Sequence, residues 1–146
     1  GINSRIDEIQ CSILNLKLSK VNLWIKRRRK FAEIYINNLK NTSLILPTEN
    51  NFNKHVFHLF VVYHPKRNEI INKLKQYKIQ ININYPYPIH KMQAYKDIKF
   101  NKTKKGTLPI TEKMSKGIFS LPLHPGMKKN EILRVSSVLK KIVMKM

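Results

Sequence analysis

The 146-residue sequence is poor in cysteine and contains no long apolar run. Its one cysteine, Cys11, excludes a disulfide within the chain and favours a reducing compartment such as the cytoplasm. We expect Cys11 to be a small, packed side chain on a helix. No stretch reaches the roughly 18 apolar residues that a transmembrane helix needs, so no membrane span is predicted.

Glycine and clustered metal ligands are scarce as well. The four glycines are scattered, which excludes a glycine-rich nucleotide-binding loop. One cysteine and dispersed histidines exclude a zinc ribbon. His55 and His58 would lie on opposite faces of a strand, so we do not expect them to share a metal ion. His64 follows at the end of that strand beside Pro65, where we expect it to be exposed.

Acidic residues are few: 8 Asp and Glu stand against 29 Lys and Arg, which gives a formal net charge of +21. Such a charge suggests an acidic partner such as nucleic acid, a membrane surface or a phosphorylated ligand. Most of the basic residues are lysine, however, and AT-rich DNA encodes lysine, asparagine and isoleucine by default. Arginine, which is better suited to phosphate and base contacts, is scarce. A basic nucleic-acid-binding module therefore remains an alternative and not the main interpretation.

The pattern of apolar residues indicates an α/β domain. Residues 2–46 lack Gly and Pro, and their apolar spacing predicts one long helix, straight or bent, over about 5–40, with the basic block 27–30 as a solvated face. The apolar stretch 55–64 predicts a central strand. The other expected elements are short strands at 41–47, 79–83 and 118–121, a helix at 66–78 with Ile70, Ile71, Leu74 and Tyr77 inward, a helix from Pro109, and a helix at 130–146. This order predicts two layers: a small, mostly antiparallel sheet with helices on one face, and the long helix leading in.

Four stretches carry more than a packing pattern. In the most unusual one, NYPYPIH, two prolines stiffen the backbone around Tyr85 and Tyr87, and His90 follows at once. The four stretches, in order, are GINSRIDEIQ (1–10), HVFHLF (55–60), NYPYPIH (84–90) and SLPLHPG (120–126).

These stretches resemble the motifs of the PLP-dependent nucleotide-sugar aminotransferases of the DegT/StrS type. That family carries a Gly-x-Asn-x-Arg-x-Asp-Glu-x-Gln segment that opens a long helix, then His-x-x-His-Leu-(Tyr/Phe) on a strand. A His-Tyr-Pro-x-Pro-x-His loop and a Leu-Pro-x-His-Pro-Gly turn follow. The resemblance covers essentially the whole chain. It implies the C-terminal small domain of a fold-type-I PLP-dependent transferase, with residues 1–40 as a helix leaving a large PLP-binding domain and residues 41–146 as the small domain.

The resemblance also implies roles for individual residues. Tyr85 and His90 would contact the nucleotide-sugar substrate. Asn3 would reach the phosphate of pyridoxal 5'-phosphate (PLP) in the neighbouring subunit, and Arg5 would bind substrate near the cofactor or the sugar diphosphate. A helix start favours such anions. The alternatives are a packing role for the tyrosines, a plain helix cap for Asn3 and a surface ion pair for Arg5.

Two further positions, His124 and Asn84, also fall within the family motifs. His124 falls in the Leu-Pro-x-His-Pro-Gly turn, where we expect a structural role. Asn84 stands where the family usually has the first histidine of the loop. Asparagine can form hydrogen bonds but cannot shuttle a proton near neutral pH, which puts any acid–base role at this position in doubt.

The central residues of such an enzyme are not recognisable in the sequence. The family's Schiff-base lysine and the acidic partner of the cofactor ring lie upstream of the segment that Gly1 opens, and no lysine here has the expected context. We therefore expect a fragment that is inactive alone. The longer enzyme, a homodimer, would move an amino group from L-glutamate to a keto group of a nucleotide-linked sugar. A non-catalytic remnant that pairs with a full-length homologue is a further alternative.

Overall fold

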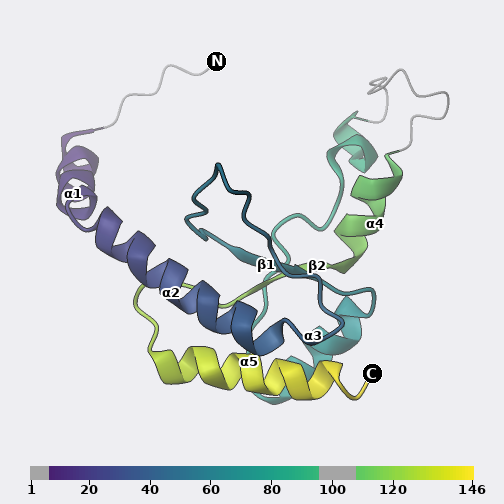
Figure 1. The fold of residues 1–146 in the computed structure, drawn as a ribbon. Helices are drawn as coiled ribbons and strands as arrows, with labels where there is room; N and C mark the ends of the chain where they lie inside the picture. The colour runs from purple at the N-terminus through teal and green to yellow at the C-terminus, as the bar shows by residue number, and fades with distance from the viewer. Residues whose placement is uncertain (1–6, 96–107) are drawn as a thin grey trace.

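The computed structural model describes residues 7–95 and 108–146 (Figure 1). It opens with two helices in place of the single one predicted, α1 (Glu8–Leu18) and α2 (Val21–Leu39), and α1 turns away from the axis of α2. At the break, the Ser19 hydroxyl donates a hydrogen bond to the Leu16 carbonyl at 2.8 Å. Such local side-chain bonds compete with the helical pattern. None of the helices within the described residues is long and apolar enough to span a bilayer.

The sheet is small and antiparallel. Strand β1 (Phe60–Tyr63) pairs with β2 (Ile118–Leu121), with Phe60 opposite Leu121 and Tyr63 opposite Ile118. Single bridges from Ile45 to Tyr63 and from Asn82 to Ser120 place the segments around 45 and 82 on the two outer sides. The segments predicted as strands therefore do lie side by side, but two of them contribute only one bridge each.

Three further helices follow the predicted positions closely: α3 (Arg67–Gln76), α4 (Pro109–Gly117) and α5 (Lys129–Val143). Pro109 is the first residue of α4, as its fixed φ favours. In α3, Ile70 and Leu74 are fully buried. Tyr77 was predicted to point inward, but it follows the last residue of α3 and is 51% exposed.

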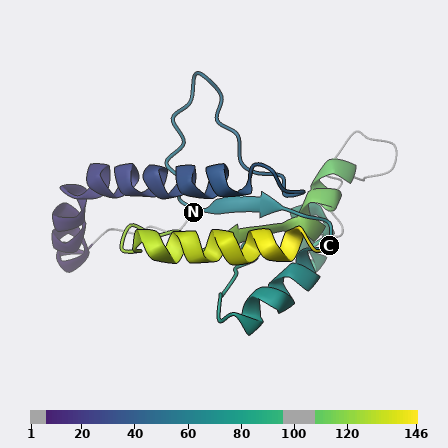
Figure 2. The same ribbon diagram turned by 60° about the horizontal axis from the view of Figure 1, so that its bottom comes forward.

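The core lies between the sheet and the helices. Figures 1 and 2 show α2 and α5 side by side, and their inward faces share one apolar cluster with the strands. Tyr35, at its centre, is fully buried and donates its hydroxyl to the Pro122 carbonyl at 2.8 Å. Burial raises the pKa of this tyrosine. The principal members of the cluster are Phe31, Ala32, Tyr35, Leu39, Phe60, Val62, Ile70, Leu74, Phe119, Leu121, Ile132, Val135 and Leu139.

Two single-residue expectations were wrong. Cys11 is exposed, because α1 buries none of its residues. His64 is buried: its Nε2 lies 3.1 Å from the Ser43 hydroxyl, and its Nδ1 accepts the Lys66 backbone N–H at 3.1 Å. Burial, together with the charge of Lys66, lowers the pKa of this histidine. Its backbone N–H donates to the Gly117 carbonyl at 3.1 Å, which holds His64 against the end of α4.

Candidate functional site

The segment 84–90 leaves the sheet immediately after the bridge at Asn82. It ends in a short 3-10 turn, η1 (Ile89–Lys91), which a second such turn, η2 (Gln93–Tyr95), follows. Tyr85 is 72% exposed and Tyr87 is 68% exposed. The proline-stiffened loop therefore presents two aromatic rings to the surface, as a binding loop would. A substrate contact for Tyr85 remains a prediction.

His90 is held beneath this surface. Its imidazole Nε2 lies 3.0 Å from Glu112 Oε1 on α4, and its side chain is only 5% exposed. Glu112 Oε1 also accepts the backbone N–H of Leu108 at 3.1 Å and lies 3.5 Å from Lys91 Nζ. The hydrogen bond from His90, then that from Leu108, lowers the pKa of the Glu112 carboxyl group. The structure thus brings His90 together with an acidic residue that the sequence did not single out.

Asn84 anchors the other end of the segment. Its side-chain oxygen accepts a hydrogen bond from the Ser120 hydroxyl on β2 at 2.8 Å. An amide at this position can make that contact without any proton transfer. Asn84 therefore has a structural explanation in this chain, where the family usually has histidine.

The basic block of α2 does more than face solvent. Arg28 Nη1 donates to the carbonyls of Phe57, His58 and Leu123 at 3.1, 2.8 and 3.0 Å. It thereby joins the HVFHLF and SLPLHPG stretches, which are far apart in sequence.

Arg29, next in the block, forms two hydrogen bonds to the Glu49 carboxylate, at 2.8 and 3.2 Å. The expectation of a solvated face is wrong for these two arginines, whereas Arg27 and Lys30 are exposed.

The Leu-Pro-x-His-Pro-Gly turn is held by its own histidine. His124 Nδ1 accepts the Gly126 N–H at 3.2 Å, and the His124 carbonyl accepts the Met127 N–H at 3.2 Å. The histidine is exposed. These contacts confirm the structural role predicted for it.

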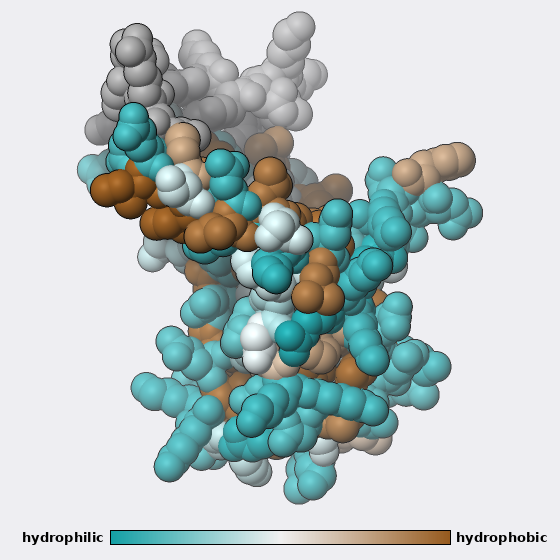
Figure 3. Space-filling view, turned by 90° about the vertical axis from the view of Figure 1, so that its left-hand side faces the viewer, coloured by the Kyte–Doolittle hydropathy of each residue, from teal (hydrophilic) through white to brown (hydrophobic). Residues whose placement is uncertain are grey.

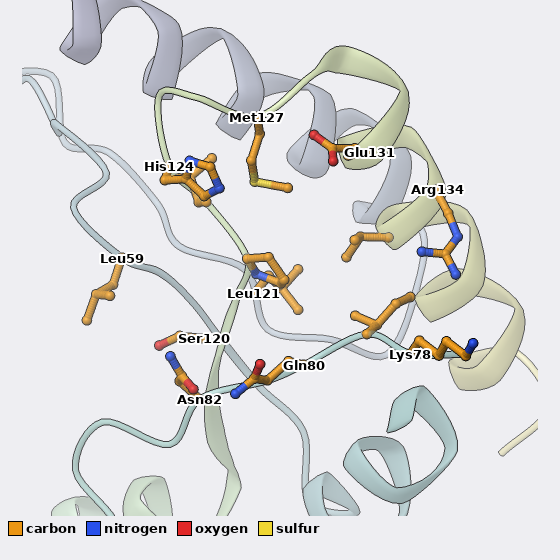
Figure 4. Close-up of a pocket in the computed structure, with 14 residues that line it drawn as sticks. Leu59, Lys78, Gln80, Asn82, Ser120, Leu121, His124, Met127, Glu131 and Arg134 are labelled. Carbon is orange, nitrogen blue, oxygen red and sulfur yellow. The ribbon is translucent and has the colours of Figure 1, made fainter. Parts of the chain in front are cut away.

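A pocket of about 480 Å³ lies beside this turn (Figure 4). The segments 78–82 and 120–124 form two of its walls, and the first half of α5 forms the third. Figure 4 shows Asn82 and Gln80 beside Ser120 at one end, with Arg134 and Glu131 on α5 at the other. Neither Tyr85 nor His90 lines it. Tyr85 and His90 are therefore separate from this pocket.

Two other chemistries find no support in the geometry. Within residues 7–95 and 108–146, no group of three His, Cys, Asp or Glu side chains is placed to hold a metal ion. Ser43 and His64 are in hydrogen-bond contact, but His64 Nδ1 already accepts a backbone N–H. The neutral ring therefore carries its hydrogen on Nε2 and cannot take a proton from the Ser43 hydroxyl there.

Comparison with known proteins gives the family. The model of the DegT/DnrJ/EryC1/StrS aminotransferase family matches residues 1–140. The chain belongs to this family. A relative from Micromonospora megalomicea subsp. nigra, named dTDP-3-amino-3,4,6-trideoxy-alpha-D-glucose transaminase, is 36% identical over 98% of this chain and 39% of its own length. Another, from Aneurinibacillus thermoaerophilus and named dTDP-3-amino-3,6-dideoxy-alpha-D-galactopyranose transaminase, is 38% identical over 92% of this chain and 36% of its own length.

Solved structures agree on the fold. S. venezuelae DesV, in complex with a ketimine intermediate, matches with a TM-score of 0.92 and 28% identity over 100% of this chain and 39% of that chain. NtdA from Bacillus subtilis, with the bound cofactor PMP, matches with a TM-score of 0.82 and 29% identity over 100% of this chain and 34% of that chain. The predicted α/β fold of a fold-type-I PLP-dependent transferase is confirmed. The chain spans well under half the length of the curated relatives it matches.

The described residues do not form a site for pyridoxal phosphate. Such a site needs a lysine amine, a carboxylate for the ring nitrogen and donors for the phosphate. Lys91 and Glu112 are in contact, but that carboxylate already holds His90 and the Leu108 N–H. Asn3 and Arg5, the residues predicted to lie near the cofactor, are outside the described residues. We therefore derive no chemical step through the cofactor in this chain.

Proposed function

We propose that this chain is the C-terminal part of an aminotransferase that moves an amino group from L-glutamate to a keto group of a nucleotide-linked sugar. The observation that carries this proposal is the match of the aminotransferase family across residues 1–140. The printed names of the two relatives, both dTDP-sugar transaminases, support the substrate class.

Pyridoxal 5'-phosphate is the cofactor that family membership implies, and it would carry the amino group between donor and acceptor. We place the Schiff-base lysine and the carboxylate for the ring nitrogen in polypeptide outside this chain, so the chain alone would be inactive. The share of the relatives that the chain covers, 39% and 36%, leaves room for such a domain. The cytoplasm remains the proposed location, on the grounds of cysteine content and substrate class.

The exposed apolar face of α1 supports assembly with further polypeptide. Ile9 and Leu16 are both 75% exposed, and no residue of α1 is buried. Figure 3 shows apolar side chains gathered where α1 lies, and a surface of this kind marks an interaction site. We propose that residues 1–40 leave a large PLP-binding domain, that residues 41–146 form the small domain, and that the longer protein works as a homodimer. Asn3 would then reach the cofactor phosphate of the partner subunit, with Arg5 near the substrate.

The loop 84–90 is the proposed substrate contact. A tyrosine offers an apolar ring face and a hydroxyl, and both suit a nucleotide-sugar. The two prolines reduce the conformational freedom that the loop loses on binding. Tyr85 would contact the substrate directly. His90 would contact the substrate with the edge of its imidazole ring, or would hold the loop in place from beneath.

The test begins with the DNA upstream of the Gly1 codon. We expect it to encode a lysine-bearing cofactor segment, and the longer product to show the visible absorbance of bound cofactor. It should transfer the amino group of L-glutamate to keto sugars linked to dTDP or UDP. Asn3→Ala should weaken cofactor retention, and His90→Ala should raise the KM for the nucleotide-sugar more than that for glutamate. A longer product with neither absorbance nor transfer would contradict the proposal.

A further inference from the structure

The segment 84–90 is tied to the rest of the domain at both of its ends. At its start, Asn84 accepts the Ser120 hydroxyl of β2 at 2.8 Å. At its end, His90 contacts Glu112 of α4 at 3.0 Å. The exposed rings of Tyr85 and Tyr87 stand between these two anchors. The geometry of the rings therefore depends on Ser120 and Glu112, which lie outside the segment.

Of the two residues that hold the ends of the segment, Ser120 and Glu112, Glu112 makes more side-chain contacts. One oxygen, Oε1, meets His90 Nε2, the Leu108 N–H and Lys91 Nζ. Leu108 is the residue before α4 and has no side-chain cap of its own. The carboxylate therefore does two things: it satisfies a backbone donor at the helix start, and it holds the end of the loop against that helix.

The contact also fixes the state of the imidazole. An ionised carboxylate only accepts hydrogen bonds, so His90 Nε2 must carry the hydrogen. In the neutral ring, Nδ1 is then an acceptor. Charge-assisted bonds of this kind are short and strong compared with neutral ones. Removing the carboxylate would release both the ring orientation and the hydrogen position.

We propose that Glu112 is a positioning residue for substrate binding, acting through His90 to hold the loop 84–90 so that Tyr85 meets the nucleotide-sugar. This rests on the function proposed above, and it adds a residue that acts on acceptor binding and not on the amino donor. Glu112 itself touches the loop from the side of α4. Its effect reaches the substrate only through His90 and the stiff Tyr-Pro-Tyr-Pro backbone.

The test uses the longer aminotransferase, with steady-state kinetics for both substrates. Glu112→Ala should raise the KM for the nucleotide-sugar about tenfold, which corresponds to about 1.4 kcal/mol, and leave the KM for L-glutamate unchanged. Glu112→Gln keeps an acceptor oxygen for Nε2 and for Leu108, so its effect should be smaller. The double variant with His90→Ala should be no worse than the more damaging of the two single variants, because the two residues act along one route.

A matched control is available at the start of α5. Glu131 Oε2 accepts the Lys128 N–H at 2.6 Å, so Glu131→Ala also removes a carboxylate from a helix start, away from the loop. It should leave the nucleotide-sugar KM unchanged. If Glu112→Ala matches this control, or lowers kcat for both half-reactions without a KM difference, Glu112 only stabilises its helix and the inference is overturned.

A second measurement does not depend on activity. Diethyl pyrocarbonate modifies accessible imidazoles, and mass spectrometry locates the modified residue. In the wild-type chain the His90 side chain is only 5% exposed, against Glu112. His90 should therefore react faster in Glu112→Ala than in wild type or Glu131→Ala. If the wild-type enzyme fails to transfer amino groups, the proposed function fails. An unchanged rate at His90 overturns the positioning contact instead, whatever the activity.

Discussion

Helices α1 and α2 come from one continuous stretch without glycine or proline, yet they behave in opposite ways. α2 buries Phe31, Ala32, Tyr35 and Leu39 against α5 and the sheet, whereas α1 buries no residue. Both carry apolar residues at helical spacing. Apolar spacing therefore predicts a helix, but it does not show whether the apolar side chains of that helix are buried within the domain.

The two helices should differ strongly in what the loss of one leucine costs. Leu39→Ala, in α2, should lower the free energy of unfolding of the 146-residue chain by about 2–5 kcal/mol, because Leu39 is fully buried and its loss leaves a cavity. Leu16→Ala, in α1, should change it by less than about 0.5 kcal/mol, since Leu16 is 75% exposed. Urea unfolding followed by circular dichroism measures both.

The same two variants have a different expected outcome in the longer protein. If α1 packs against polypeptide outside this chain, Leu16→Ala should become destabilising there, while Leu39→Ala keeps its effect. Equal losses for the two variants in the 146-residue chain would show that α1 is buried within it, contrary to the structure.

A smaller loss of unfolding free energy is expected when the hydrogen bond of Tyr35, on the inward face of α2, is removed. Tyr35→Phe removes the donor to the Pro122 carbonyl and should cost about 0.5–1.5 kcal/mol of unfolding free energy. Tyr77→Phe is the matched control, because that tyrosine lies beyond the end of α3 and is 51% exposed. A loss as large from Tyr77→Phe would mean that the hydroxyl of Tyr35 contributes nothing specific.

Much of the fold could be predicted because its signals are local. The period of apolar residues located α3 and α5, and proline at a helix start located α4. The start of one strand could not be predicted, because contacts from distant residues determine it. β1 begins only at Phe60, since Arg28 takes the carbonyls of Phe57 and His58 and Phe57 has a positive φ of 49°. No pattern within 55–64 reveals an arginine that lies some thirty positions earlier.

In the candidate site, too, features with a local sequence signal could be predicted, and contacts from distant residues could not. The prolines beside Tyr85 predicted a loop at 84–90, and in the structure Tyr85 and Tyr87 of that segment are exposed. The residues that hold it, Ser120 and Glu112, were missed because serine on a strand and glutamate on a helix are common residues. The one available signal was the place of Glu112 in the first turn of a helix that starts with proline, where a carboxylate can accept a free backbone N–H.

A weaker effect is expected for the ion pair between Arg29, on the outer side of α2, and Glu49. The hydrogen bond from Arg29 lowers the pKa of Glu49 in the folded chain. A lowered folded-state pKa means that this pair stabilises the fold above the pKa of an unfolded glutamate, and that the contribution is lost as the pH falls through the folded value. The midpoint of urea unfolding should therefore fall less steeply with acid in Glu49→Gln than in wild type. Arg29→Met should flatten the same part of the curve only partly, because the His55 backbone N–H also donates to Glu49 Oε1, at 2.6 Å, and lowers the pKa of that carboxyl group. The double variant should match Glu49→Gln, since the titrating carboxylate is absent from both. Additive changes in the two single variants would instead assign the acid sensitivity to separate interactions of each residue.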